Sequence, residues 1–122
     1  MPKRVVSEAI REAPQSARLD EDRFWRAAAS LLAQEGVTRS TMMGFPCLRV
    51  DGRFLASYDR ATGDLLVKLP ADRVDQLLAN GQGHAFSPAG RRFREWVALP
   101  PAAESDWGNY LDEALRFVAG SG

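Results

Sequence analysis

The sequence predicts an α+β fold with an antiparallel sheet of about 4–5 strands, helices at both termini and one helix after the strand meander. Three observations support this prediction. Apolar residues recur with helical spacing near both ends of the chain. Short β-branched and apolar runs fill the middle. Asp51-Gly52 separates two of these runs and is a strong hairpin signal. The expected order of elements is α-β-β-β-β-α-β-α.

The composition indicates one globular domain. Of 122 residues, 45% are hydrophobic and 26% are charged, which is ordinary for a chain with a buried core. The formal net charge is zero, which counts against a broad electrostatic attraction to nucleic acid or to membranes. The charge is uneven, however. Residues 36–97 carry nine Lys and Arg against six Asp and Glu, whereas residues 98–122 are acidic.

The sequence favours a cytoplasmic protein without a membrane partner. A single cysteine, Cys47, excludes an internal disulfide. No apolar run is long enough to span a membrane, and the first residues lack the pattern of a signal peptide. Fourteen arginines against two lysines are typical of a GC-rich bacterial genome.

The first helix is expected to begin at Asp20, which is a good N-cap residue. Residues 1–19 are weakly patterned, and Pro14 would end any helix within them. We expect these residues to form a weakly ordered arm before a single domain at 20–119. Gly36 is placed to end the helix as a left-handed C-cap. The buried stripe of this helix would consist of Phe24, Trp25, Ala28, Leu31 and Leu32.

Four strands are expected next, at residues 37–43, 47–50, 53–58 and 65–69. Their short lengths and close turns predict an antiparallel meander. Pro70 closes it, because proline cannot donate a hydrogen bond to a sheet ladder.

A two-residue turn at Asp51-Gly52 would place Leu48 opposite Leu55 and Cys47 opposite Ala56. The hairpin side chains then divide into Leu48, Val50 and Leu55 on one face and Phe45, Cys47, Phe54, Ala56 and Tyr58 on the other. Both faces are apolar, so both need a cover. The cover would be helices on both sides or a second copy of the chain, which would make a homodimer.

The sequence after Pro70 predicts a helix at 71–79, an irregular stretch at 82–92 and a strand at 95–99. A final helix, capped by Ser105 or Asp106, is expected to follow. The final helix has the clearest periodicity in the chain. Its apolar stripe is Trp107, Tyr110, Leu111, Ala114, Leu115 and Val118.

Several of these segments resemble a known family. The strings MMGF at 42–45, DGRFLA at 51–56, LLVKL at 65–69 and REWV at 94–97 are similar to the N-terminal domain of TfoX/Sxy-type proteins. They also resemble the related YjbR/MmcQ proteins. The resemblance covers residues 20–119. It implies a "double-wing" α/β plan and a role in DNA binding or transcriptional co-activation, without a catalytic constellation. Competence regulators of this family carry a second domain, for which this chain has no room.

No catalytic, metal or cofactor site is recognised. Cys47 and the only histidine, His84, could form a nucleophile–base pair, but a buried strand thiol is the favoured interpretation. His84 alone cannot hold a metal ion. Residues 81–83 read Gly-Gln-Gly but follow a helix, so they do not form a phosphate loop. Trp96 could stack on a ligand, although a strand tryptophan is more often part of the core.

Arginines near turns and loops are the best candidates for contact with a partner. They are Arg49, Arg53, Arg91, Arg92 and Arg94. The expected function is a non-enzymatic binding or regulatory module whose partner is DNA or another protein. Three alternatives stay open: a homo-oligomer using the second apolar sheet face, a small-ligand binder, and an enzyme whose site forms only between subunits.

Overall fold

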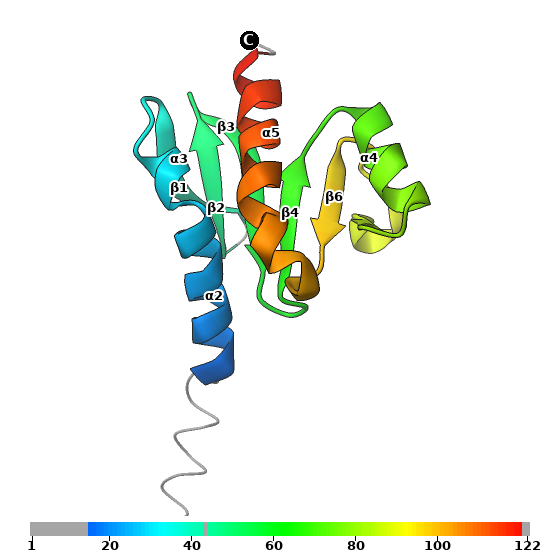
Figure 1. Ribbon diagram of the computed structural model, residues 1–122, viewed down its shortest axis with the longest axis horizontal. Helices are drawn as coiled ribbons and strands as arrows, with labels where there is room; N and C mark the ends of the chain where they lie inside the picture. Colours follow the sequence, from blue (N-terminus) through cyan, green and yellow to red (C-terminus); the bar gives the residue numbers. More distant parts are fainter. Residues whose placement is uncertain (1–14, 43, 121–122) are drawn as a thin grey trace, which may run out of the picture.

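The chain forms a single antiparallel sheet with its helices gathered on one side (Figure 1). The structure is a computed structural model, and it describes residues 15–42 and 44–120. The elements are α2 (Gln15–Ala27), α3 (Ala29–Leu32), β1 (Val37–Met42), β2 (Phe45–Val50), β3 (Arg53–Asp59), β4 (Asp64–Lys68), α4 (Ala71–Ala79), β5 (His84–Ala85), the 3₁₀ helix η1 (Pro88–Gly90), β6 (Trp96–Leu99), the 3₁₀ helix η2 (Pro101–Asp106) and α5 (Trp107–Gly120).

The sheet has six strands in the order β1-β2-β3-β4-β6-β5, and all neighbouring strands are antiparallel. This confirms the predicted α+β class. The strand count was too low because β5, a two-residue strand, lies in the stretch that we expected to be irregular. A strand this short has no alternating pattern to detect, and it exists through its pairing with β6.

The helices cover one face of the sheet. The final helix, α5 (orange to red in Figure 1), runs across β3 and β4, α3 lies against β1, and α4 lies beside β5 and β6. The buried residues between these helices and the sheet form one hydrophobic core. The largest of its fully buried side chains are Trp107, Tyr58, Phe24, Leu31, Leu48, Leu55, Leu65, Leu69, Leu77, Leu99, Leu111 and Val67.

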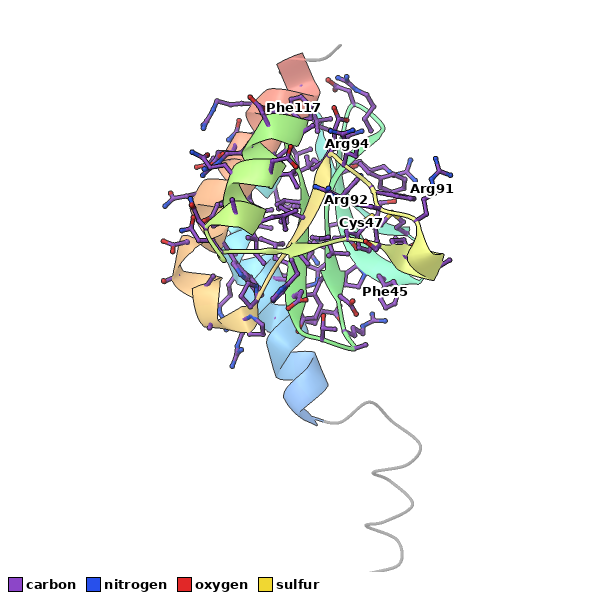
Figure 2. The ribbon with its side chains drawn as sticks, turned by 90° about the vertical axis from the view of Figure 1, so that its right-hand side faces the viewer. Phe45, Cys47, Arg91, Arg92, Arg94 and Phe117 are labelled. Carbon is purple, nitrogen blue, oxygen red and sulfur yellow. The ribbon has the colours of Figure 1, made fainter. Side chains whose placement is uncertain are left out.

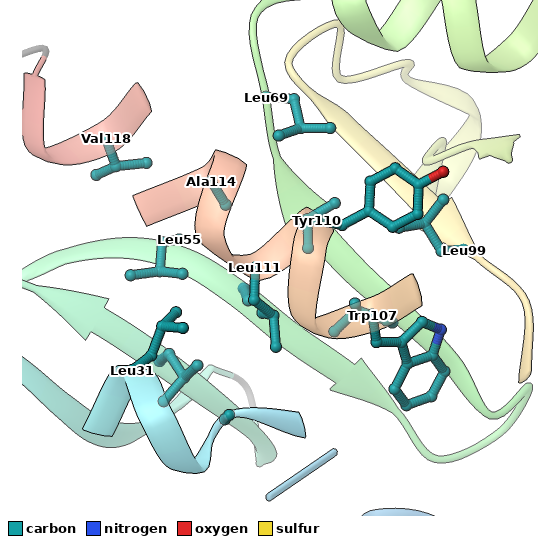
Figure 3. Close-up of a cluster of buried hydrophobic side chains, with 14 of the residues drawn as sticks. Leu31, Leu55, Leu69, Leu99, Trp107, Tyr110, Leu111, Ala114 and Val118 are labelled. Atoms are coloured by element: carbon teal, nitrogen blue, oxygen red, sulfur yellow. The ribbon is translucent and has the colours of Figure 1, made fainter. Parts of the chain in front are cut away.

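The final helix supplies much of this core (Figure 3). Trp107 and Leu111 are fully buried. The indole Nε1–H of Trp107 donates a hydrogen bond to the carbonyl oxygen of Pro100 at 3.3 Å, so its polar atom is satisfied inside the core. The stripe of apolar residues predicted from periodicity is therefore confirmed as the buried face of α5.

The first helix starts earlier than predicted. Helix α2 begins at Gln15, so Asp20 lies inside the helix and is not its N-cap. Residues 15–19 of the predicted arm belong to α2, and the rest of that arm lies outside the described residues. After α2 the helix breaks at Ala28 and continues as α3. Gly36 has the positive φ expected of it, at 85°.

The β2–β3 hairpin contains a bulge that the sequence did not predict. Val50 pairs with Arg53, as expected, but Leu48 pairs with Ala56 instead of Leu55. One extra residue on β3 therefore lies between the pairs Leu48–Ala56 and Arg49–Phe54. A β-bulge of this kind shifts the register by one residue and changes which face the following side chains occupy.

The bulge corrects the predicted division of the hairpin into two faces. Ala56 and Tyr58 belong to the helix-covered core, together with Leu55. Phe54 and Cys47 remain on the opposite face, so the predicted grouping of Phe54 with Ala56 and Tyr58 is wrong. The second face is thus less apolar than the sequence suggested.

The packing of α5 predicts a large loss of stability when its buried face is truncated. Trp107→Ala or Leu111→Ala should lower the free energy of unfolding by about 2–5 kcal/mol, because each leaves a cavity in a packed core. Asn109→Ala, at an exposed position of the same helix, should change it by less than about 0.5 kcal/mol. Urea denaturation measures these differences. A chain ending at Pro101 that unfolds at the unchanged midpoint would contradict this role of α5.

Candidate functional site

The second face of the sheet carries no α-helix within residues 15–42 and 44–120, and we call it the open face. In Figure 2 the helices α4 and α5 lie to the left of the sheet, and η1 and Arg91 lie to the right. Strand pairing and alternation place these side chains on the open face: Thr38, Ser40, Met42, Phe45, Cys47, Arg49, Phe54, Ser57, Leu66, Lys68, His84, Trp96 and Ala98.

Aromatic rings gather at one end of the open face. The β5–β6 segment, residues 86–95, folds back on itself, and the backbone N–H of Phe93 donates to the carbonyl oxygen of Phe86 at 3.0 Å. The centroid of the Phe86 ring lies 5.6 Å from that of Phe93 and 6.3 Å from that of Trp96. All three side chains are half-buried. Trp96 lies outside the hydrophobic core, so it is not the core residue that a strand tryptophan usually is.

The β2–β3 hairpin presents a fourth ring. Phe54 is half-buried, and the guanidinium carbon of Arg49 lies 4.1 Å from its ring centroid. Nη1 of Arg49 also donates a hydrogen bond to the carbonyl oxygen of Gly52 at 3.3 Å. These two contacts hold a positive charge against an aromatic face near the tip of the hairpin.

A row of small side chains crosses the middle of the open face. Cys47 pairs with Ser57, Ser57 with Leu66, and Leu66 with Ala98. All four residues are at most 6% exposed.

A pocket of about 650 Å³ lies between the hairpin tip, the β5–β6 segment and the C-terminal end of α5, which contributes Phe117 and Val118. This volume falls in the range of small-molecule sites. The pocket is mostly apolar, and its charged lining residues are Arg53, Lys68 and Glu95. The full lining is Met42, Gly52, Arg53, Phe54, Lys68, Phe86, Phe93, Glu95, Trp96, Phe117 and Val118.

The predicted arginines come from the two segments that flank this pocket. Arg53 lines it directly, and Arg49 lies over the ring of Phe54. On the other side, the guanidinium carbon of Arg91 lies 5.4 Å from the ring centroid of Phe93. Arg94 is exposed.

Arg92 differs from the other arginines of the β5–β6 segment. Its Nη2 donates to Oδ1 of Asp75 on α4 at 2.9 Å. This ion pair directs Arg92 toward the helix layer. The structure thus brings Arg49, Arg53 and Arg91 around the pocket and gives Arg92 an acidic partner elsewhere.

The charge of the open face is polarised along the strands. The basic residues lie at the hairpin-tip end, where the one acid that lines the pocket is Glu95, whose Oε1 is 3.9 Å from Nζ of Lys68. At the far end of β3 and β4, Asp59 pairs with Asp64. An anionic ligand would therefore place its charge at the hairpin-tip end, away from these two aspartates.

The structure does not bring Cys47 and His84 together. Both belong to the row of paired residues across the open face, but β2 and β5 are four strand spacings apart, which is about 19 Å. Burial raises the pKa of the Cys47 thiol, and a hydrogen bond with Ser40 and the charge of Arg49 offset this only in part. The described residues contain no group of three or more His, Cys, Asp or Glu side chains placed to hold a metal ion.

The comparisons do not assign the chain to a family. No family model, no curated protein and no solved structure matches it. Among the helices of the described residues, none has the length and apolar character needed to cross a membrane.

The sequence analysis identified the arginines near the pocket but did not identify most of the aromatic residues that line it. Phe86 lies in the stretch 82–92 that was expected to be irregular and Phe93 directly after it, and only tertiary folding brings them against Trp96. The signal that could have revealed them is the close interleaving of aromatic and basic residues at 86–96, which is typical of surfaces that bind nucleic acid.

The environment of Cys47 predicts a quiet thiol. The side chain is fully buried, and its raised pKa leaves little thiolate at neutral pH. Labelling of the native protein with a thiol reagent should be slow and should accelerate on denaturation. Rapid labelling of the native protein would revive the nucleophile hypothesis.

Proposed function

We propose that this chain is a non-enzymatic binding module that holds nucleic acid against the open face of its sheet. The observation that carries the proposal is the pocket, in which aromatic rings are flanked on two sides by arginine-bearing segments. Guanidinium groups attract phosphates, and aromatic rings offer surfaces on which bases stack.

The zero net charge of the chain is compatible with this proposal because the charges are segregated. Arg53 and Lys68 line the pocket, Arg49 and Arg91 lie over its rings Phe54 and Phe93, and Glu95 is the acid among the lining residues. A local cluster of this kind supports weak, salt-sensitive binding, with a Kd of about 10⁻⁴–10⁻⁶ M at physiological salt. A regulatory role and a cytoplasmic location belong to the same proposal.

A homodimer is the second candidate, and Phe45 favours it. At 38% exposure, it is the one large hydrophobic side chain of the described residues that is exposed. It lies on β2 beside β1, and β1 is an edge strand of the sheet. Pairing of two copies through β1 would cover this edge and Phe45 together. Sedimentation that gives a monomer at high protein concentration would remove this candidate.

The proposal predicts a salt dependence that is set by the arginines of the open face. Each neutralised phosphate contributes about 0.7 to the slope of log affinity against log salt for a single strand and about 0.9 for a duplex. The double variant Arg91→Gln/Arg94→Gln should therefore flatten the slope by about 1.4–1.8. Fluorescence anisotropy with a labelled single strand and a labelled duplex, measured over a range of salt concentrations, gives this slope.

The matched control is the double variant Arg26→Gln/Arg116→Gln, which removes the same number of charges from exposed positions on α2 and α5 in the helix layer. It should leave the slope unchanged. Absence of binding to either nucleic acid at low salt and high protein concentration would refute the proposal, and a protein would then be the better candidate partner.

A further inference from the structure

We infer that the pocket between the hairpin tip and the β5–β6 segment takes an unpaired base, so that the ligand is a single strand rather than a duplex. This inference rests on the proposed function and deepens it by naming the form of nucleic acid. The inference is argued from three features of the pocket: its aromatic rings, the arginines beside these rings, and the polar side chains among its lining residues.

The rings of the pocket are available for stacking. Phe54, Phe93 and Trp96 line the pocket and are half-buried, so each leaves part of its surface accessible. They do not belong to the hydrophobic core. Every base has a π-face that can stack on such a ring, but in a duplex that face is covered by the neighbouring base pairs.

The cations are placed to follow the backbone of a strand whose base enters the pocket. Arg49 lies over Phe54 on one wall, and Arg91 lies over Phe93 on the other. A base between these walls would have a guanidinium on either side, where the phosphates before and after it would lie. A duplex needs cations that reach its phosphates, but it has no use for an aromatic pocket between them.

The pocket also contains polar atoms for the edge of a base. The Glu95 carboxylate accepts hydrogen bonds, and the Lys68 ammonium donates them. Their separation of 3.9 Å is too long for a hydrogen bond, so each can bond a ligand instead. These groups would meet the donors and acceptors that an unpaired base exposes and a paired base does not.

The test compares ligands of equal length, of which the three single strands also carry equal charge and differ in their bases or sugars. Fluorescence anisotropy at low salt would use a labelled single-stranded DNA, the same sequence as RNA, its duplex, and an abasic sugar-phosphate strand. The single strands should bind about tenfold or more tightly than the abasic strand, because stacking of one base contributes on the order of a tenfold gain. The duplex should bind less tightly than the base-bearing single strands, although it carries about twice their charge. The DNA and RNA arms identify which backbone is preferred.

Two variants locate the effect. Trp96→Leu should abolish the difference between the base-bearing and the abasic strand, and Phe93→Leu should reduce it. Trp25→Leu is the matched control, since Trp25 is a half-buried tryptophan of the helix layer, and it should leave the difference intact. Thermal unfolding of each variant confirms that it folds. If the Trp96→Leu variant does not fold, the binding difference measured with Phe93→Leu alone tests the inference.

The outcomes separate this inference from the proposed function. Equal binding of the base-bearing and abasic strands would overturn the inference that the pocket takes an unpaired base, but it would leave the proposed binding of phosphates intact. A duplex that binds more tightly than both kinds of single strand would have the same consequence. A difference that survives both pocket variants would also overturn it. Absence of binding to all four ligands would refute the proposed function itself.

Discussion

One extra residue in β3 determines which side chains reach the core and which reach the open face. Strict alternation from the Asp51-Gly52 turn would put Phe54 on the same face as Ala56 and Tyr58. The bulge opposite Leu48 and Arg49 changes this alternation. Tyr58 then enters the core, where its ring lies 5.9 Å from that of Phe24 and 6.3 Å from that of Trp107.

The same bulge creates the hairpin wall of the candidate site. It keeps Phe54 on the open face beside Arg49, near the tip of the hairpin, while α5 covers the opposite face of β3. The opposite wall comes from residues 86–96, which the pairing of β6 with β4 and β5 holds against the sheet. Two segments far apart in the sequence therefore meet at one pocket, and each brings a ring with an arginine over it. The ring side chains Phe54, Phe93 and Trp96 of the pocket lie outside the hydrophobic core, whereas its lining residue Val118 on α5 belongs to the core.

The sequence predicted the elements with strong periodicity and failed where tertiary contacts decide. The α5 stripe from Trp107 to Val118, the strands and the Asp51-Gly52 turn all follow local rules, and the structure confirms them. The bulge carries no mark in the sequence, because Leu55 and Ala56 fit either face of a strand. Asp20 has the chemistry of an N-cap, but the helix extends past it to Gln15.

The site was predictable only in part. The arginines were recognisable because turns and loops expose cations. The role of Arg92 was not, because its ion pair with Asp75 joins two segments that are distant in sequence. The pocket was also not predictable, since Phe86, Phe93 and Trp96 become one cluster only when the β5–β6 segment folds back on itself.

The most direct test of the account is an NMR titration with a short single-stranded oligonucleotide that follows the indole N–H signals. The chain has three tryptophans, at 25, 96 and 107, and each gives one such signal. Trp107 is fully buried in the core, Trp25 lies in the helix layer, and Trp96 lines the pocket. The account predicts that the Trp96 signal shifts while the other two stay in place. A shift of the Trp25 signal with Trp96 unchanged would place the ligand on the helix layer and contradict the account.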